Sequence, residues 1–266
     1  MSELLNHLLP FMLATFRVAG AMILAPLVGG TTIPAQARVL IAFALAAAMY
    51  PAVAPAASGA ALPVAQDHDV FSIGVAVAGE TLIGFSIGLL MMMPVAAVQL
   101  AGLLMGQQMG FGLAQVYNPS LDIDTDMLGD LLGYIALGAF ITIGGLEGTF
   151  IAVARTFESI PLASSGVVMA PVDLLVNLLG SGFDLATRVS LPLMGIILIE
   201  TVAMALLTKT LPQANIMSIG FAIKILLGFA AILAGLGAGT TAISDHVSET
   251  ARLVLQWAGA AGGQGT

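Results

Sequence analysis

The stretch that decides how this chain is organised is residues 99–126, QLAGLLMGQQMGFGLAQVYNPSLDIDTD. Gly102, Gly106 and Gly110 are four residues apart, so on a helix they share one face. A face without side chains lets another backbone approach closely, as in membrane helices that pack through small residues. Farther along, Asn118-Pro119 is a turn signal that ends regular structure. The stretch therefore predicts a helix end followed by an irregular segment.

Composition identifies the class of protein around that stretch. The chain has 266 residues, of which 59% are hydrophobic and 8% charged, whereas soluble domains carry about 25% charged residues. We therefore predict an all-α integral membrane protein. Irregular backbone that faces lipid leaves polar groups unpaired at a cost of several kcal/mol each, roughly. Residues 99–126 should thus lie inside protein or beside a water-filled path. Their bulky side chains favour a mobile constriction, although methionine is equally common as filler in cores.

The sequence lacks the residue patterns that most catalytic, metal-binding and nucleotide-binding sites require. The chain has no cysteine, and its net charge of -8 argues against binding nucleic acid. Its histidines, His7, His68 and His246, show no metal-ligand spacing. The segment DIDTDMLGD begins like a calcium loop, but Met127 and Gly133 stand where that loop needs glycine and glutamate. Motifs for nucleotide binding or hydrolysis are missing. We predict no metal site, no cofactor and no catalytic residue, so the protein is not expected to be an enzyme.

About six apolar segments and two amphipathic ones predict the helices. The apolar segments are 4–28, 39–56, 70–104, 127–146, 172–208 and 216–240, and the amphipathic ones are 150–160 and 243–257. About 20 residues suffice to cross a bilayer, so segment 70–104 is long for one span, and 172–208 is either one bent helix or two. Charged residues interrupt the segments, namely Arg17, Glu80, Glu200 and Lys224. Because charge inside a membrane is costly, these helices should pack mainly against protein.

The four charges admit two interpretations. They either pair with neighbours or partner subunits and fix the register of assembly, or they relay protons or ions. We favour assembly, because two of the charges share a helix face with glycines that allow close packing: Glu80 with Gly84 and Gly88, and Lys224 with Gly220 and Gly228. On this interpretation Glu80→Gln should weaken assembly only modestly, since an amide retains hydrogen-bonding atoms.

Five motifs in order along the chain resemble one family. They are Arg17 with Ala25-Pro26 and the IPAQAR stretch at 33–38; Gly79-Glu80 with Gly84 and Gly88; AGLLMGQQMGFGLAQVYNP at 101–119; FESIP at 157–161; and LPQAN at 211–215 with Gly220 and Lys224-Ile225. Each motif is weakly specific alone. Together, their order and spacing resemble the FliR family of flagellar type III export-gate subunits, whose injectisome counterpart is the T subunit.

The resemblance implies an architecture. A FliR-like chain is a single domain, here 1–266, of long, kinked helices and helical hairpins packed in a hetero-oligomeric helical export gate. Residues 1–165 correspond to a FliP-like portion and residues 166–257 to a FliQ-like helical hairpin, with 258–266 expected as a disordered tail. The implied partners are FliP-like, FliQ-like and FlhB-like subunits together with unfolded flagellar export substrates.

The resemblance also implies a plug segment, residues 106–122, that closes the pore at rest. Its site residues are Gly106, Gln107, Gln108, Met109, Gly110, Phe111, Gly112, Tyr117, Asn118 and Pro119. The charges Arg17, Glu80, Glu200 and Lys224 would serve assembly, and the hairpin would turn at Pro212, Gln213 and Asn215.

The expected function is that of a structural and gating subunit of the flagellar export gate, located in the bacterial inner membrane at the flagellar basal body. One alternative keeps the family and places the chain in an injectisome. Another, from a different class, is a small-solute secondary transporter or ion channel in which Glu80 and Glu200 are coupling sites.

Overall fold

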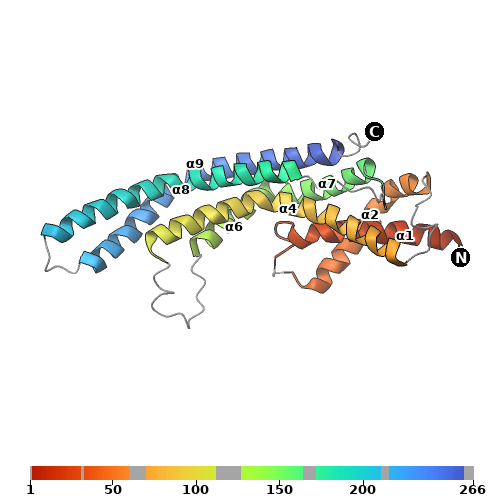
Figure 1. The fold of residues 1–266 in the computed structure, drawn as a ribbon, viewed down its shortest axis with the longest axis horizontal. Coiled ribbons are helices and arrows are strands. Elements are labelled where there is room, and N and C mark those ends of the chain that lie inside the picture. Colours follow the sequence, from red (N-terminus) through yellow and green to blue (C-terminus); the bar gives the residue numbers. More distant parts are fainter. Residues whose placement is uncertain are drawn as a thin grey trace. The chain divides into compact units, whose positions relative to one another are not determined.

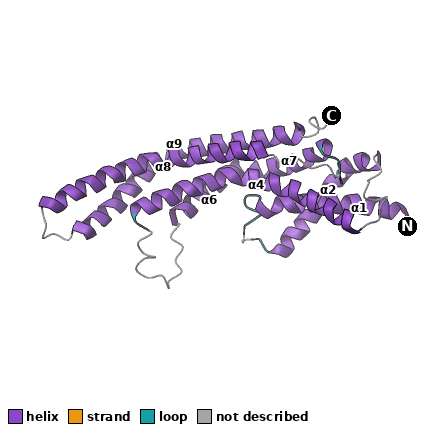
Figure 2. Cartoon of the chain, viewed as in Figure 1, coloured by secondary structure: helices purple, strands orange, loops and turns teal. Residues whose placement is uncertain are grey.

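The described part of the chain is helical throughout. The structure is a computed structural model that describes residues 2–30, 33–59, 70–111, 127–163, 172–210 and 216–260. Helices among these residues are α1 (Ser2–Leu24), α2 (Ala35–Gly59), α4 (Val70–Met109), α6 (Met127–Thr142), α7 (Gly145–Ser159), α8 (Val172–Thr210) and α9 (Ile216–Ala260) (Figure 1). Figure 2 shows helices and no strand over the same described residues. The predicted all-α class is confirmed.

Three of these helices are unusually long. Helices α4, α8 and α9 contain 40, 39 and 45 residues. At a rise of 1.5 Å per residue, a straight helix of about 40 residues extends about 60 Å, twice the thickness of a hydrocarbon core. Pro94 lies inside α4 and Pro192 inside α8. Residues 172–208 thus form part of one helix, which settles the choice left open by the sequence.

Several described helices could cross a membrane by length and apolarity. Three qualify individually, His7–Leu24, Val70–Met109 and Val172–Thr210, and up to five spans result if each of two bent pairs is one span. One bent pair is α6 with α7, which meet at 63°. Gly144 permits this bend because it adopts φ 78, a left-handed conformation that residues with a side chain rarely take. These helices confirm the prediction of a membrane protein.

The chain divides into two compact units, each built from separate stretches. Unit 1 comprises Met1–Met93, Phe140–Leu178 and Ser248–Thr266, and unit 2 comprises Pro94–Ala139 and Leu179–Val247. Helices α4, α6, α8 and α9 each contribute residues to both. Each compact unit is therefore assembled from segments that are far apart in the sequence.

In unit 1, α1 and α4 pack backbone against backbone. A Cβ atom at Gly84 would meet the carbonyl oxygen of Arg17, and one at Gly88 would meet that of Ala21. Gly20 of α1 approaches the Thr81 carbonyl of α4 as closely as Gly88 approaches that of Ala21. The glycine packing face predicted beside Glu80 is confirmed, because only residues without a side chain allow this approach.

In unit 2, the end of α4 packs on α6, and α8 runs beside α9 (Figure 1). A Cβ at Gly102 would stand 2.5 Å from the Cα of Gly129, so the α4 and α6 backbones touch there. The outer faces of α8 and α9 carry large exposed apolar side chains, including Leu198, Ile199, Val202, Leu206, Leu226, Phe229 and Leu233. So many exposed apolar side chains along two helices require lipid or protein neighbours.

The C-terminal end differs from the expected tail. Residues 258–260 belong to α9. Ala258 is fully buried in unit 1, and its carbonyl oxygen accepts a 2.7 Å hydrogen bond from the Ser159 hydroxyl of α7. The prediction of disorder from residue 258 was wrong for these three residues, because a tertiary contact stabilises the last turn. Residues 261–266 lie outside the described part of the chain.

Candidate functional site

A buried ion pair joins α1 to α4 within unit 1. Arg17 Nε donates to Glu80 Oε2 at 2.5 Å, and the two side chains are 0% and 3% exposed. The guanidinium also donates from Nη1 to Thr156 Oγ1 and from Nη2 to the Ile160 carbonyl, each at 3.2 Å. Its Cζ lies 4.5 Å from the Phe157 ring centroid, a cation–π geometry. Every nitrogen of this buried guanidinium therefore has an acceptor in the same chain.

The second oxygen of Glu80 binds the residues that follow α7. Glu80 Oε1 accepts a 3.0 Å hydrogen bond from the Ala163 backbone N–H. Ala163 has φ 56, which is uncommon for a residue with a Cβ. The Arg17–Glu80 pair thus connects α1, α4 and the C-terminal end of α7. Both charged residues stand out in the sequence, but nothing in the sequence points to Thr156, Ile160 or Ala163 as their partners.

The other two charges pair between α8 and α9. Lys224 Nζ lies 3.9 Å from Glu200 Oε2, and the side chains are 26% and 4% exposed. At this distance the attraction is electrostatic without a direct hydrogen bond. Thr201 Oγ1 lies 3.4 Å from the same Glu200 oxygen. The hairpin turn residues Pro212, Gln213 and Asn215 lie outside the described residues.

Helix α4 ends in a capped turn at the start of the plug segment. Gly110 adopts φ 88, its N–H donates to the Gln107 carbonyl, and the Phe111 N–H donates to the Gly106 carbonyl, both at 3.1 Å. This pair of bonds around a left-handed glycine is a Schellman cap. Residues 106–109 are helical, so the irregular segment begins at Gly110. The first four residues of the expected plug segment, 106–109, therefore belong to α4 and not to the irregular part.

The end of α4 points one large side chain inward. Gln107 and Gln108 are exposed, whereas Met109 is 0% exposed. The Met109 Cε and Sδ atoms lie 2.5 and 2.6 Å from the position that a Cβ of Gly228 would occupy. Met109 therefore packs directly on the bare backbone of α9. Both residues belong to patterns visible in the sequence, but no spacing in the sequence predicts their contact.

Five further site residues of the plug segment follow Gly110 in the sequence. Gly112, Tyr117, Asn118 and Pro119 lie outside the described residues. Among the described ones, Phe111 is half-buried, and one of its ring atoms lies 3.7 Å from where a Cβ of Gly106 would stand. The Phe111 ring therefore lies beside the bare backbone of Gly106 at the other end of the cap.

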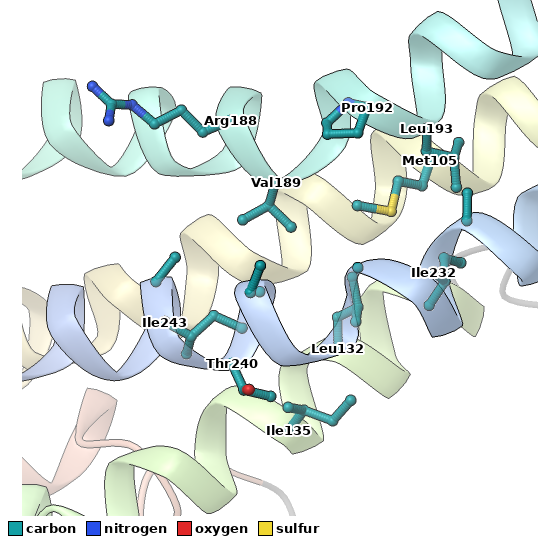
Figure 3. A pocket seen from close by; sticks show the side chains of 15 residues that line it. Met105, Leu132, Ile135, Arg188, Val189, Pro192, Leu193, Ile232, Thr240 and Ile243 are labelled. Carbon is teal, nitrogen blue, oxygen red and sulfur yellow. The ribbon is translucent and has the colours of Figure 1, made fainter.

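An apolar pocket of about 310 Å³ lies in unit 2 (Figure 3). Its walls include Met105 of α4, Leu132 and Ile135 of α6, Pro192 of α8 and Ile232 of α9. Arg188 borders it by its stem, while its guanidinium extends away from the cavity and pairs with Asp184 at 2.7 Å (Figure 3). The pocket can hold apolar groups and offers almost no polar contact to a solute.

No group of three or more histidine, aspartate or glutamate side chains stands ready to hold a metal ion within the described ranges. Arg17–Glu80 and Glu200–Lys224 instead pair between helices. The geometry as a whole comprises two inter-helix ion pairs, a capped helix end and an apolar pocket.

Comparison with known proteins matches residues 8–250 to the family described as bacterial export proteins, family 1. The flagellar biosynthetic protein FliR of Aquifex aeolicus (strain VF5) is 26% identical over 244 residues, 92% of each chain. The protein of the same name in Bacillus subtilis (strain 168) is 24% identical over 86% of each chain. Yop proteins translocation protein T of Yersinia pestis is 26% identical over 59% of this chain and 60% of its own length. Since the family match covers nearly the whole sequence, the chain belongs to the bacterial export proteins, family 1.

Proposed function

We propose that this type III export-gate subunit helps to form the pore through which unfolded flagellar proteins leave the cell, and that it closes that pore at rest. The observation that carries the proposal is the end of α4, a 40-residue apolar helix that stops at a capped glycine and leads into residues 110–122. That segment begins with Gly110 and Gly112 and also carries the bulky Phe111 and Tyr117. Such a segment combines freedom of the backbone with bulk, as a movable obstruction requires.

The partners are proposed from the faces that the chain leaves uncovered. Helix α8, with 39 residues, is longer than a bilayer is thick, and α9 bends by 58° between Ile219–Gly235 and Gly237–Ala260. The exposed faces of both helices are apolar. Lipid can cover only part of such helices, so protein should cover the rest. We take these neighbours to be FliP-like, FliQ-like and FlhB-like subunits in the inner membrane at the flagellar basal body. In this arrangement residues 1–165 are the FliP-like portion and 166–257 the FliQ-like hairpin.

The two ion pairs fit a role in assembly. Arg17–Glu80 and Glu200–Lys224 each join different helices of this chain. An ion pair buried between helices penalises every other alignment of those helices, since a shifted register would leave a charge unpaired. We propose that the pairs fix the shape that the partner subunits recognise and that they carry no protons during export.

The injectisome is the second candidate setting, because the chain also resembles Yop proteins translocation protein T of Yersinia pestis. That relative matches 59% of this chain, whereas the FliR protein of Aquifex aeolicus matches 92%. The greater coverage supports the flagellar setting. Restoring motility and flagellar secretion to a strain that lacks its own FliR protein would separate the two.

The test of the gate proposal is co-expression. The chain produced alone should aggregate or be degraded, and FliP-like and FliQ-like subunits produced with it should rescue a stable complex. A small-solute transporter would instead purify as a functional unit that binds its solute. A monodisperse, long-lived monomer obtained from single expression would contradict the proposal.

A further inference from the structure

We propose that Met109 acts as a latch, defined here as the Met109 side chain seated on the backbone of Gly228. The latch holds the end of α4, and with it the start of the plug segment, against α9. This inference rests on the proposed function for its consequence in export. The contact itself lies wholly within unit 2 and can be tested separately.

The first support is that the Met109 side chain fills the space beside the bare backbone of Gly228. The three atoms nearest to a Cβ built at Gly228 are Met109 Cε, Sδ and Cγ, at 2.5, 2.6 and 2.8 Å. Carbon atoms in favourable contact stand about 3.5–4.0 Å apart. Alanine at position 228 would therefore displace Met109. Because the obstacle is a flexible side chain and not backbone, the helices themselves need not separate.

The second support is that the latch and the helix cap are consecutive in sequence. Met109 is the last residue of α4, and Gly110 makes the left-handed turn directly after it. The two cap bonds, from the Gly110 and Phe111 amides, lie within the residues that Met109 anchors. A helix end frays unless packing or capping holds it. A substitution at Gly228 that displaces Met109 should therefore expose both amides to solvent exchange.

The third support is an apolar pocket close to the contact between Met109 and Gly228. Met105 and Met109 are four residues apart on one face of α4, and Ala231 lies three residues after Gly228 on α9. Met105 and Ala231 line the apolar pocket of about 310 Å³ (Figure 3). A displaced Met109 thus has apolar space about one turn away. Because methionine adapts readily to different apolar surroundings, the latch can open without transferring its side chain to water.

The experiment compares four variants of the complete, purified gate with the wild-type gate. They are Gly228→Ala, Met109→Ala, the double variant, and Gly180→Ala as a matched control. Gly180 also lies in a long helix of unit 2, α8, but nothing lies within 4 Å of a Cβ built there. The measurement is hydrogen exchange at the Gly110 and Phe111 amides, which reports local opening. Both single variants should exchange severalfold faster, the double variant no faster than the faster single, and the control like wild type.

Wild-type exchange in Gly228→Ala would overturn the latch, as would effects that add in the double variant, because two changes to one contact should not be independent. Should Gly228→Ala lower the yield of the complex, Met109→Ala carries the test, because it adds no bulk.

Dye permeability of cells with the same gates separates the latch from the plug. Faster exchange with wild-type permeability supports the latch and contradicts the seal proposed for residues 110–122. A leak in Met109→Ala with unchanged exchange contradicts the latch and leaves the seal standing.

Discussion

Arg17 donates to Glu80 across 2.5 Å in an almost fully buried site, and both side chains also bind the residues at the end of α7. Arginine suits this position because its planar fork presents donors in several directions, whereas lysine is a point charge on a flexible stem. Breaking such a pair by removing one partner costs more than the pair itself contributes, since a charge is then left buried and unpaired. This asymmetry makes the pair sensitive to single substitutions.

Glu80→Gln should strongly reduce the yield of assembled gate. Both carboxylate oxygens accept hydrogen bonds, one from Arg17 and one from the Ala163 amide. Glutamine supplies one acceptor and turns an NH₂ group toward the other donor. The expected loss is about 3–5 kcal/mol, as for other buried pairs that lose one partner. From these contacts we therefore expect Glu80→Gln to have a larger effect on assembly than the modest one predicted from the sequence.

The combined change Arg17→Met and Glu80→Leu is the control for that prediction. It removes both charges and should recover part of the yield, because apolar replacement of a buried pair is often tolerated. Native-gel yield and secretion are measured on the same strains. Normal yield of a Glu80→Gln gate that no longer exports would favour the proton relay over the assembly role.

Gly84→Ala should destabilise the gate, whereas Gly79→Ala should not. Both residues lie in α4, but a Cβ at Gly84 would meet the Arg17 carbonyl, and nothing lies within 4 Å of a Cβ at Gly79. Backbone cannot move aside as a side chain can, so the overpacking cost should be about 1–3 kcal/mol or more. The check is the thermal midpoint of the purified complex. Equal midpoints for the two variants would show that α1 and α4 do not pack through this face.

Lys224→Met should harm the gate more than Glu200→Met does. The Glu200 side chain is 4% exposed and that of Lys224 26%. Without Lys224 a carboxylate stays buried without its counter-charge, while without Glu200 the amine can still reach solvent. Complex yield and thermal midpoint of the two variants give the comparison. The reverse order would mean that a partner subunit supplies a second cation to Glu200.

Deleting residues 112–119 should make cells with the complete gate leak ions or small dyes. The deletion leaves Met109 and both cap bonds of α4 in place, so a leak would report loss of the obstruction itself. Export should survive, because removing an obstruction does not remove the channel. Wild-type permeability with a normal amount of complex would show that these residues do not form the seal.

Composition and local pattern were enough to predict the class, most of the helices and the glycine face of α4, although segments 216–240 and 243–257 belong to one element, α9. An apolar chain with 8% charged residues has few alternatives to membrane helices. Residues four apart share a helix face whatever surrounds them, which is why Glu80, Gly84 and Gly88 were correctly placed on one packing surface. These properties depend on neighbours in sequence, and sequence alone therefore determines them.

The partners of each side chain were decided only by the tertiary structure. Arg17 and Glu80 are 63 residues apart, and Arg17 and Ile160 143 apart, so no spacing rule connects them. The same holds for the ends of helices: α4 continues to Met109 because α9 buries that side chain, and α9 continues to Ala260 beyond a contact with Ser159. A helix end is marginal on local preference alone, and contacts from distant segments supply the free energy that decides where it stops.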